Sequence, residues 1–478
     1  MDIIAQYKKI LKQFNGKIIE HLKNKLDEVE ENPDADITEF TKQLNEDLNE
    51  LGRKITRATL ENKDKEICNS EERLIEGWSV EHKDNNKSLI TVFGEIEYER
   101  RYYRDKEGNY SYLVDDLFGI ENKQRMTPLV ESKLVELSSE TSYAKSGEKA
   151  VEDVTISDTT VMNKVHQLDD LEEVLEEKEA KEDKREVDVI YIEADEDHVA
   201  LQSGKNTMTK LVYIHEGHKT PEEIDNSNSK LKNPKYIAGE YKNSEELWLE
   251  VADYLHDTYD MDKVKKVFIG GDGASWIREG LNWIPGARFV LDKFHLNEYI
   301  ISATAHAEKH KFRIWCALSR LDRDRVSLLF SELIAKADKE SRKKRIREAR
   351  KYIYNQWDGI KNLIADEDSI NPSAEGHVSH ILSDRLSSRP MGWSRTGMDR
   401  MSRLRAFKFN GGSKKDILRL IVQKKREKKK QQTIENIFAK KPSHSKLINK
   451  YGDKKENIPT LRRGKVRGTY QAVKGLAR

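Results

Sequence analysis

The sequence predicts an α+β multidomain protein with a helical N-terminal region, an α/β core and a basic C-terminal tail. Three observations support this prediction. The 478 residues exceed the usual size of one domain, the spacing of apolar residues changes repeatedly between helical and strand periods, and only nine prolines interrupt the chain. With 36% of the residues charged, many helix faces are expected to be solvated.

The net charge of +1 hides an uneven distribution. Residues 401–478 contain 24 Lys and Arg but 5 Asp and Glu, whereas the other 400 residues contain 62 and 80. A basic tail on an acidic body favours a polyanionic partner. No run of eighteen apolar residues occurs, and the N-terminus lacks the features of a signal peptide, so no membrane association is expected. The two cysteines, Cys68 and Cys316, indicate a reducing cytoplasm.

Residues 1–87 are predicted to be helical, with a break at Pro33 and an N-cap at Asp36. The helical spacing is set by six apolar residues: Ile10, Leu11, Phe14, Ile18, Ile19 and Leu22. Residues 88–127 then alternate apolar and charged side chains, which predicts a small β-hairpin unit with DKEGN as a turn. Three of its arginines could contact DNA phosphates, the alternative being an ordinary hairpin with one charged face: Arg100, Arg101 and Arg104.

Residues 128–168 predict a helix, a turn and a second helix that Ser157 caps, with Val161, Val165 and Leu168 facing inward. This is the pattern of a DNA-binding helix-turn-helix, although helix pairs are common in any helical protein. The residues expected to face DNA are Thr159, Asn163 and Lys164. An acidic linker, expected to be solvated and helical, follows at 169–187.

The α/β core begins at residues 188–308. Strands are expected at 187–197, at HVALQ (198–202) and at 210–217, followed by a helix. A buried strand that ends in Gly-Gly-Asp-Gly and leads into a helix is expected in KKVFIGGDGASWI (265–277), and another strand at ARFVLDKFH (287–295), followed by a helix. Three meandering strands followed by two strands with helical crossovers is the order of a ribonuclease H-like fold. An all-helical insertion is expected at 309–370, the end of the core at 371–400, and the basic tail at 401–478.

Three acids lie where these elements begin or end: Asp195, Asp272 and Glu375. The proposed sheet makes the strands of the first two acids neighbours, and paired carboxylates bind hard divalent cations such as Mg²⁺. An Asp after a strand is also a common turn or cap residue. Glu193, Asp195 and Asp197 share one face, and Asp195 is the preferred first ligand because it is expected nearest the strand end. Further candidates for supporting the site or contacting DNA are Asp197, Asp292, His295, His377, Arg385 and Arg389.

Five stretches together resemble the ISLre-type transposases of bacterial insertion sequences and, more distantly, the Mutator-like DDE transposases. They are FGEIEYERRYYRD, YIEADEDHVALQ, GGDGASWI, LDKFHLNEYI and AEGHVSHILSDRLSSRPMGW. The resemblance covers nearly the whole chain and is loosest before residue 85. It implies a ribonuclease H-like domain with a helical insertion before the last acid, and metal-dependent DNA cleavage and joining. By position, the three acids of that family fall on Asp195, Asp272 and Glu375, and Asp292 and His295 stand where Mutator-like enzymes have C-x-x-H or D-x-x-H.

The sequence is therefore interpreted as a bacterial transposase that acts in the cytoplasm on nucleoid DNA. The three acids would hold two Mg²⁺ or Mn²⁺ ions, the helix pair and the hairpin would read terminal inverted repeats, and the tail would grip phosphates of these repeats and of target DNA. The densest basic run includes Lys424, Lys425 and Arg426. Because two transposon ends must meet, a homo-oligomer is expected. A non-catalytic DNA-binding protein derived from a transposase, or a plain metal-dependent nuclease, are the alternatives.

Overall fold

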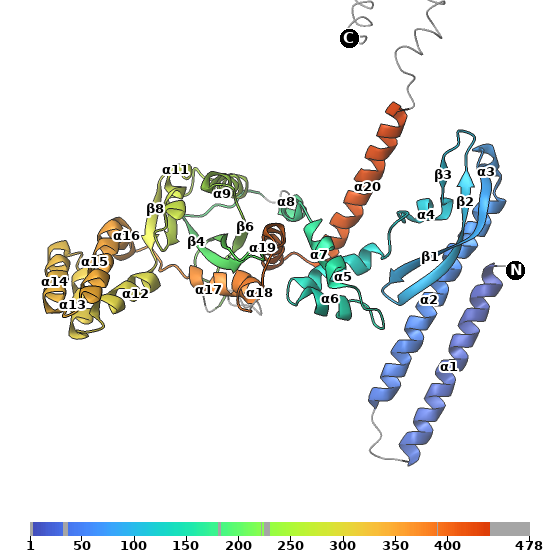
Figure 1. Cartoon of the computed structure of the whole chain (residues 1–478), viewed down its shortest axis with the longest axis horizontal. Helices are drawn as coiled ribbons and strands as arrows, with labels where there is room; N and C mark the ends of the chain where they lie inside the picture. Colours follow the sequence, from blue (N-terminus) through green and yellow to red (C-terminus); the bar gives the residue numbers. More distant parts are fainter. Residues whose placement is uncertain are drawn as a thin grey trace, which may run out of the picture. The chain divides into compact units, whose positions relative to one another are not determined.

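The computed structural model describes residues 3–31, 37–179, 183–220, 222–223, 230–389 and 391–439. Pro33 and Asp36, at which a break and a helix cap are predicted, lie outside these ranges. The chain divides into two units, Met1–Leu418 and Arg419–Arg478, and the described part of the second is helical (Figure 1). No helix among the described residues is both long enough and apolar enough to cross a membrane.

The N-terminal region forms three helices, α1 (Ile3–Glu31), α2 (Ile37–Asn69) and α3 (Glu71–Ile75). Helices α1 and α2 run antiparallel: the hydroxyl of Tyr7 lies 2.9 Å from that of Thr59, and His21 Nδ1 lies 2.8 Å from a carboxylate oxygen of Asp47. These contacts agree with the predicted helical period.

The first sheet contains β1 (Ser79–Thr91), β2 (Gly94–Arg104) and β3 (Tyr110–Ser111) in sequential order. The predicted DKEGN turn joins β2 to β3, where the Asp105 side chain accepts hydrogen bonds from the backbone of Glu107 and Asn109 at 2.8 and 2.7 Å. The prediction of helix up to residue 87 is wrong, because the strand begins at Ser79. Residues 81–88 are polar and show no alternation, and pairing with β2 is what makes them a strand.

Helix α4 (Leu113–Phe118) leads to a three-helix unit of α5 (Pro128–Ser138), α6 (Tyr143–Lys149) and α7 (Asp158–His166). The predicted cap is confirmed, since Ser157 Oγ accepts the backbone N–H of Thr160. Val161 and Val165 are fully buried, as predicted. The acidic linker forms α8 (Leu171–Glu179), but it is not merely solvated, because its apolar residues Leu171, Val174 and Leu175 are buried.

The second sheet contains five strands in the order β6-β5-β4-β7-β8: β4 (Val189–Ala200), β5 (Asn206–His215), β6 (Lys235–Gly239), β7 (Lys266–Gly271) and β8 (Ala287–Leu291). β4, β5 and β6 pair antiparallel, whereas β7 and β8 run parallel to β4. The structure therefore has a three-strand meander followed by two crossover strands, which is the predicted order, although not all of the predicted meander strands are the observed ones.

Two of the three meander strands differ from the prediction. HVALQ is not a separate strand: β4 continues through the acidic residues to Ala200, because Asp195 and Asp197 remain paired with Leu211 and Thr209 of β5. The third strand is the short β6, which the sequence interpretation missed. Asp195 thus lies within β4 rather than at its end.

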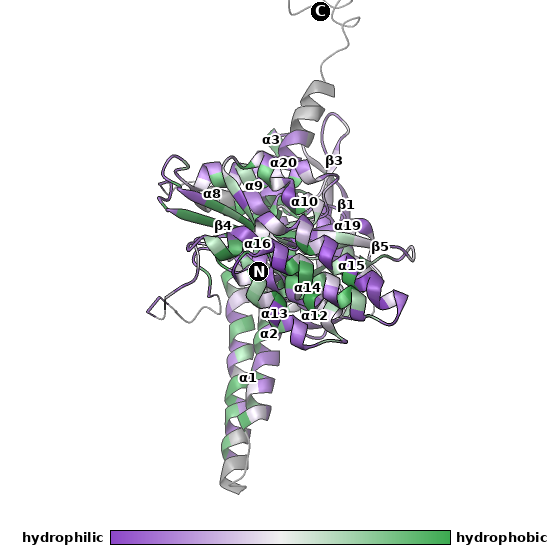
Figure 2. Ribbon diagram, turned by 90° about the vertical axis from the view of Figure 1, so that its left-hand side faces the viewer, coloured by the Kyte–Doolittle hydropathy of each residue, from purple (hydrophilic) through white to green (hydrophobic). Residues whose placement is uncertain are grey.

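Helices cover both faces of this sheet. α9 (Ser244–Thr258), α10 (Ser275–Arg278) and α12 (Lys293–Thr304) contribute to the main core, which includes Ile192 and Ile269, while α11 (Gly280–Trp283) adjoins β8. On the other face Tyr191, Phe268 and Val290 pack with Leu363 and Ile370. The predicted helical stretch forms α13 (Lys309–Ser319), α14 (Arg323–Lys336), α15 (Glu340–Asn355) and α16 (Trp357–Ala365). In Figure 2, α15 is largely purple, which matches its many charged residues.

The chain then forms a short helical segment of α17 (Ala374–Val378), a π-helix (Ser379–Ser383) and α18 (Asp384–Leu386). Helix α19 (Arg395–Phe409) packs along β6, where Asn410 accepts the N–H of Tyr236 at 2.7 Å and donates to its carbonyl at 2.8 Å. Helix α20 (Lys414–Ala439) begins in the first unit and continues into the second.

Candidate functional site

Strand register brings acids of three neighbouring strands to the same level. The β4–β7 ladder ends with Glu193 opposite Gly270, and the β7–β8 ladder ends with Gly271 opposite Leu291. Continuing each register places Asp195 beside Asp272 and Asp272 beside Asp292. The backbone N–H of Asp292 still donates to the Gly271 carbonyl at 2.8 Å, so β7 and β8 have not separated at this point. The strands β4 and β7 are also close here, since a Cβ on Gly271 would lie 2.8 Å from the Ala194 carbonyl oxygen. The pairing of Asp195 with Asp272 therefore follows from sheet topology.

The loop that carries Asp272 is built around glycines. Gly271 has no room for a side chain, because a Cβ would lie 2.8 Å from the Ala194 carbonyl oxygen. Gly273 has φ +90°, a conformation that L side chains rarely adopt. Between them, Asp272 Oδ1 accepts the N–H of Ala274 at 2.8 Å, which fixes the carboxylate at the start of α10.

Asp292 and His295 form a second fixed pair beside these acids. Asp292 caps α12 by accepting the N–H of Phe294 at 2.9 Å, and its other oxygen lies 2.8 Å from His295 Nδ1. The hydrogen bond to Asp292, together with the charges of Asp292, Asp272 and Asp195, raises the pKa of His295 to about 9. His295 is therefore protonated at neutral pH and places a positive charge beside the acids.

The position of Asp195 raises the pKa of its carboxyl group. Burial raises its pKa to about 6, and the nearby charges of Asp272 and Glu196 add to the increase. The backbone N–H of Glu196 and the charge of His295 lower the pKa and offset part of this effect. A carboxylate that is costly to ionise and lies beside another carboxylate is typical of functional sites.

The helical insertion contacts the Asp272 loop directly. The hydroxyl of Tyr352 donates to the Asp272 carbonyl at 2.6 Å, and Gln356 Nε2 donates to the Gly273 carbonyl at 3.1 Å. The ring of Tyr352 stacks on Tyr299 of α12 at 3.9 Å between centroids. The sequence interpretation missed Tyr352 and Gln356, because their spacing shows only a helix and nothing in it indicates a contact some 80 residues away.

Glu375 lies exposed at the start of α17, and α17 packs against β4. Beside this contact lies Glu193 of β4, which is 3% exposed and accepts hydrogen bonds from the backbone of Ser373, the residue before α17, and from the Tyr213 hydroxyl of β5. Among the described residues, no three His, Cys, Asp or Glu side chains gather closely enough to hold a metal ion. The structure thus pairs Asp195 with Asp272 and sets Glu375 on an adjoining helix.

The other residues predicted to support this site have different environments. Asp197 is 8% exposed and accepts a hydrogen bond from Ser387 Oγ at 2.9 Å. His377 packs its ring against Tyr213 at 4.3 Å, and its Nδ1 lies 3.3 Å from the Tyr236 hydroxyl. Burial lowers the pKa of His377. Asp197 and His377 therefore connect the Glu375 segment to the sheet.

Arg385 does not face solvent as a DNA contact would. It is 6% exposed, donates from Nε to the Ser138 carbonyl at 2.9 Å, and lies over the ring of Trp393 at 4.8 Å. Burial lowers its pKa to about 10. The prediction that it contacts DNA is corrected: Arg385 joins the Glu375 segment to α5. Arg389 is exposed, as a DNA contact requires.

The hairpin arginines are also mostly engaged within the protein. Arg100 is buried, pairs with Asp115 and stacks on Tyr112 at 3.5 Å, so its predicted phosphate contact is corrected. Arg101 pairs with Asp64 of α2. Arg104 is exposed beside Tyr110 and remains a candidate.

The predicted DNA-facing side of α7 is partly open. Thr159 and Asn163 are exposed, but Lys164 Nζ lies 3.1 Å from the carboxylate of Glu131 in α5. The tail candidates belong to the second unit, on α20, where Arg426 is exposed and Lys424 and Lys425 are half-buried.

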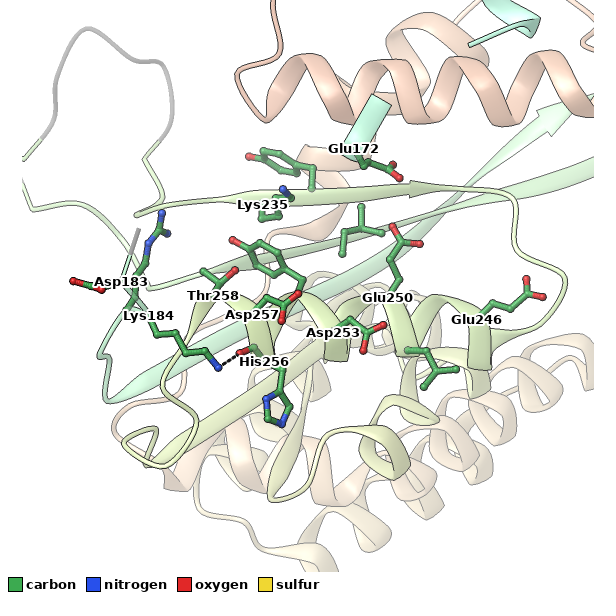
Figure 3. A pocket seen from close by; sticks show the side chains of 15 residues that line it. Glu172, Asp183, Lys184, Lys235, Glu246, Glu250, Asp253, His256, Asp257 and Thr258 are labelled. Atoms are coloured by element: carbon green, nitrogen blue, oxygen red, sulfur yellow. Dashed lines mark hydrogen bonds between the residues drawn. The ribbon is translucent and has the colours of Figure 1, made fainter. Parts of the chain in front are cut away.

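Two cavities lie away from the acids. One of about 1050 Å³ opens at the β6 edge of the sheet, and its lining mixes acids such as Glu250 and Asp253 with the basic residues Lys184, Arg185 and Lys235 (Figure 3). A second cavity, of about 370 Å³, lies between the three-helix unit and the core. Its lining includes Tyr143, Thr159, His166, Arg385 and Trp393.

Comparison with known proteins shows the family to which this sequence belongs. Residues 32–444 match the model described as an uncharacterised protein family, UPF0236. One UPF0236 protein of Caldanaerobacter subterraneus subsp. tengcongensis is 42% identical over 474 residues, covering 97% of this chain and 98% of that protein. A UPF0236 protein from the vanSb 3′ region of Streptococcus gallolyticus is 26% identical, covering 74% and 78%. A Drosophila P element transposase in a strand transfer complex gives a TM-score of 0.22 at 10% identity, covering 63% of this chain and 82% of that one, which is too slight to assign a fold. By its sequence, the chain belongs to the UPF0236 family.

Proposed function

We propose that this protein is a DDE transposase of an insertion sequence, with a ribonuclease H-like core that cleaves and joins DNA strands. The observation that carries the proposal is the register that sets Asp195 of β4 beside Asp272 after β7. The strand order, the helical insertion and the position of Glu375 on a helix packed against β4 agree with it.

The residues present fit divalent metal ions. All three acids offer oxygen ligands, which Mg²⁺ and Mn²⁺ prefer. The raised pKa of Asp195 reflects a carboxylate whose charge a cation would stabilise. Asp195 and Asp272 would hold the metal ions, and Glu375, on the helix packed against β4, would complete the ligand shell. When bound, two such ions lower the pKa of a coordinated water or hydroxyl and stabilise the leaving oxygen.

The chain's own groups would then orient the DNA, and no covalent bond between protein and DNA would form during the reaction. In cleavage, water attacks the phosphorus and the 3′ oxygen of the transposon end leaves as a hydroxyl. In joining, that 3′-hydroxyl attacks a phosphodiester of the target and displaces its 3′ oxygen. Protonated His295, held through Nδ1 by Asp292, would offset the added negative charge of the phosphate.

Double-stranded DNA is the proposed partner, both as transposon ends and as target, and a homo-oligomer would hold two ends together. Exposed Thr159, Asn163, Arg104 and Arg389 are the candidates for contact within the first unit. The basic composition of residues 401–478 supplies a phosphate-binding tail. The name of one 42% identical relative joins eleven locus designations of a single strain, as expected of a gene that a mobile element has multiplied. The proposed location is the bacterial cytoplasm.

A strand-transfer assay tests this function. Purified protein is incubated with DNA carrying the ends of its own element, target plasmid and Mg²⁺ or Mn²⁺, and is compared with Asp272→Ala and with Asp188→Asn as an exposed control. Joined products from the wild type and Asp188→Asn, but not from Asp272→Ala, support the proposal. Cleavage without joining would indicate a nuclease, and DNA binding without either reaction a non-catalytic binding protein; both would refute transposase activity.

A further inference from the structure

Glu193 is a buried acid that the proposed reaction does not use. It lies two residues before Asp195 on the same face of β4, yet it is 3% exposed, and three donors surround its carboxylate. Oε2 accepts the Tyr213 hydroxyl and the Ser373 backbone N–H, and Oε1 lies 3.0 Å from His215 Nε2. A buried carboxylate with this many donors is held in one position.

The proton on His215 can be placed from its other contact. The Gly217 N–H donates to Nδ1 at 3.1 Å, so Nδ1 carries no proton. The proton of the neutral ring is therefore on Nε2, which donates to Glu193. Since His215 is fully buried and bonded on both nitrogens, it fixes Glu193 from the side opposite Ser373.

Ser373 is the residue immediately before α17, and Glu375 follows two positions later. The backbone N–H of Ser373 belongs to the set that a helix leaves without an internal partner, so a side-chain acceptor there also anchors the helix start. The neighbouring Pro372 lies against Gly270 of β7, where a Cβ would come within 2.5 Å of the proline Cγ. The entry to α17 is thus seated on both β4, which carries Asp195, and β7, which Asp272 directly follows.

We propose that Glu193 is a positioning residue for Glu375: its carboxylate pins the Ser373 N–H and so sets the distance of the third acid from the other two. This inference rests on the proposed function, because it gives Glu193 a role in assembling that same metal site. Glu193 itself would not bind metal, because both of its oxygens are already occupied by donors from the chain.

The variants that test this differ in what they leave at Ser373. Glu193→Ala removes the acceptor, whereas Glu193→Gln keeps one carbonyl oxygen that can accept the Ser373 N–H. Ser373→Ala is the matched control, because it retains the backbone N–H and loses an Oγ that lies 3.5 Å from Glu193 and 3.1 Å from the Tyr213 hydroxyl. Asp115→Asn, which alters a buried, ion-paired acid near the hairpin, controls for the general cost of losing a buried charge.

Two measurements on the full chain separate anchoring from its consequence. Hydrogen exchange of residues 373–378, without metal, reports the anchor. Faster exchange in Glu193→Ala but not in Ser373→Ala or Asp115→Asn is expected, with Glu193→Gln in between. Equal protection in Glu193→Ala and wild type would overturn the inference whatever the protein catalyses.

Mn²⁺ binding measured by electron paramagnetic resonance reports the consequence. A loss of affinity of about 10- to 100-fold is expected for Glu193→Ala, the range for residues that orient metal ligands, with partial recovery in Glu193→Gln. DNA binding should be unchanged. Unaltered Mn²⁺ affinity despite faster exchange would overturn the positioning role. If the Asp195→Ala and Asp272→Ala variants bind Mn²⁺ as tightly as the wild type does, the proposed function is refuted, and this inference with it.

Discussion

Asp195→Asn should stabilise the protein at neutral pH and abolish its proposed activity. Burial, with Asp272 and Glu196 nearby, raises the pKa of Asp195 from 3.8 to about 6. The folded state therefore binds this proton more tightly than the unfolded chain does. The contribution of Asp195 to the free energy of unfolding is therefore greatest below pH 3.8, falls as the pH rises from 3.8 to about 6, and stays lower above that. Asn resembles the protonated acid and does not incur this loss.

The magnitude follows from the shift of about two pKa units, each worth about 1.4 kcal/mol, so the wild type loses roughly 3 kcal/mol at most. For a domain of about 200 residues, each kcal/mol corresponds to roughly 2–4 °C in melting temperature. The advantage of Asp195→Asn should grow between pH 4 and pH 6.5 and then level off.

The assay is thermal unfolding across this pH range with a metal chelator present. Asp188→Asn is the control, since its exposed side chain pairs only with Lys265 and should change stability by less than about 0.5 kcal/mol. Added Mn²⁺ should raise the melting temperature of the wild type and not that of Asp195→Asn. A variant that is no more stable than wild type at pH 7, or whose advantage does not depend on pH, would refute the reasoning.

Three further predictions concern the contacts around the site. Tyr352→Phe should lower the free energy of unfolding by about 1–3 kcal/mol, because the Asp272 carbonyl loses its donor, and should slow strand cleavage. Tyr354→Phe is the control, since it loses a similar bond to the Arg323 carbonyl and should leave cleavage unchanged. Equal cleavage rates in the two variants would contradict the role of Tyr352. Gly273→Ala should be more destabilising in thermal unfolding than Gly286→Ala, because both have positive φ but only at Gly273 would a Cβ collide with Gln356; similar losses would contradict this. Arg389→Ala, at an exposed residue, should weaken DNA binding and reduce its dependence on salt without changing the melting temperature. Arg385→Ala, at a buried residue, should instead lower the melting temperature by several degrees. The reverse pattern would show that the environments assigned to these two arginines are wrong.

The sequence was informative where the signal is local. The change of apolar period located the helices and the buried strands, and Ser157 identified a helix cap because capping depends on residues three positions apart. An Asp after a strand is a common turn or cap residue, and Asp272 does accept the backbone N–H of Ala274, beside Gly273 with φ +90°. The strand order followed from the alternation of strands and helices, since crossover connections leave few arrangements.

The sequence was misleading where a residue's environment depends on distant partners. A burst of acids suggested the end of a strand, yet β4 continues through it because β5 provides partners for every residue from Tyr191 to Ala200. Arg100 and Arg385 are of the residue type that contacts DNA, but both are held inside the protein. Arg100 pairs with Asp115, and Arg385 donates to the Ser138 carbonyl. Whether a charged side chain is buried is decided by what packs on it.

The sequence alone determined the order of strands that makes β4 and β7 neighbours, because periodicity and connection rules act along the chain. Tertiary structure decided which acid of the Glu193, Asp195 and Asp197 series faces the site. Glu193 is enclosed by donors from β5 and Ser373, and Asp197 accepts a bond from Ser387, while Asp195 alone lies level with Asp272. All three lie on the same face of one strand, so their roles are distinguished only by the residues that pack against them from distant parts of the chain.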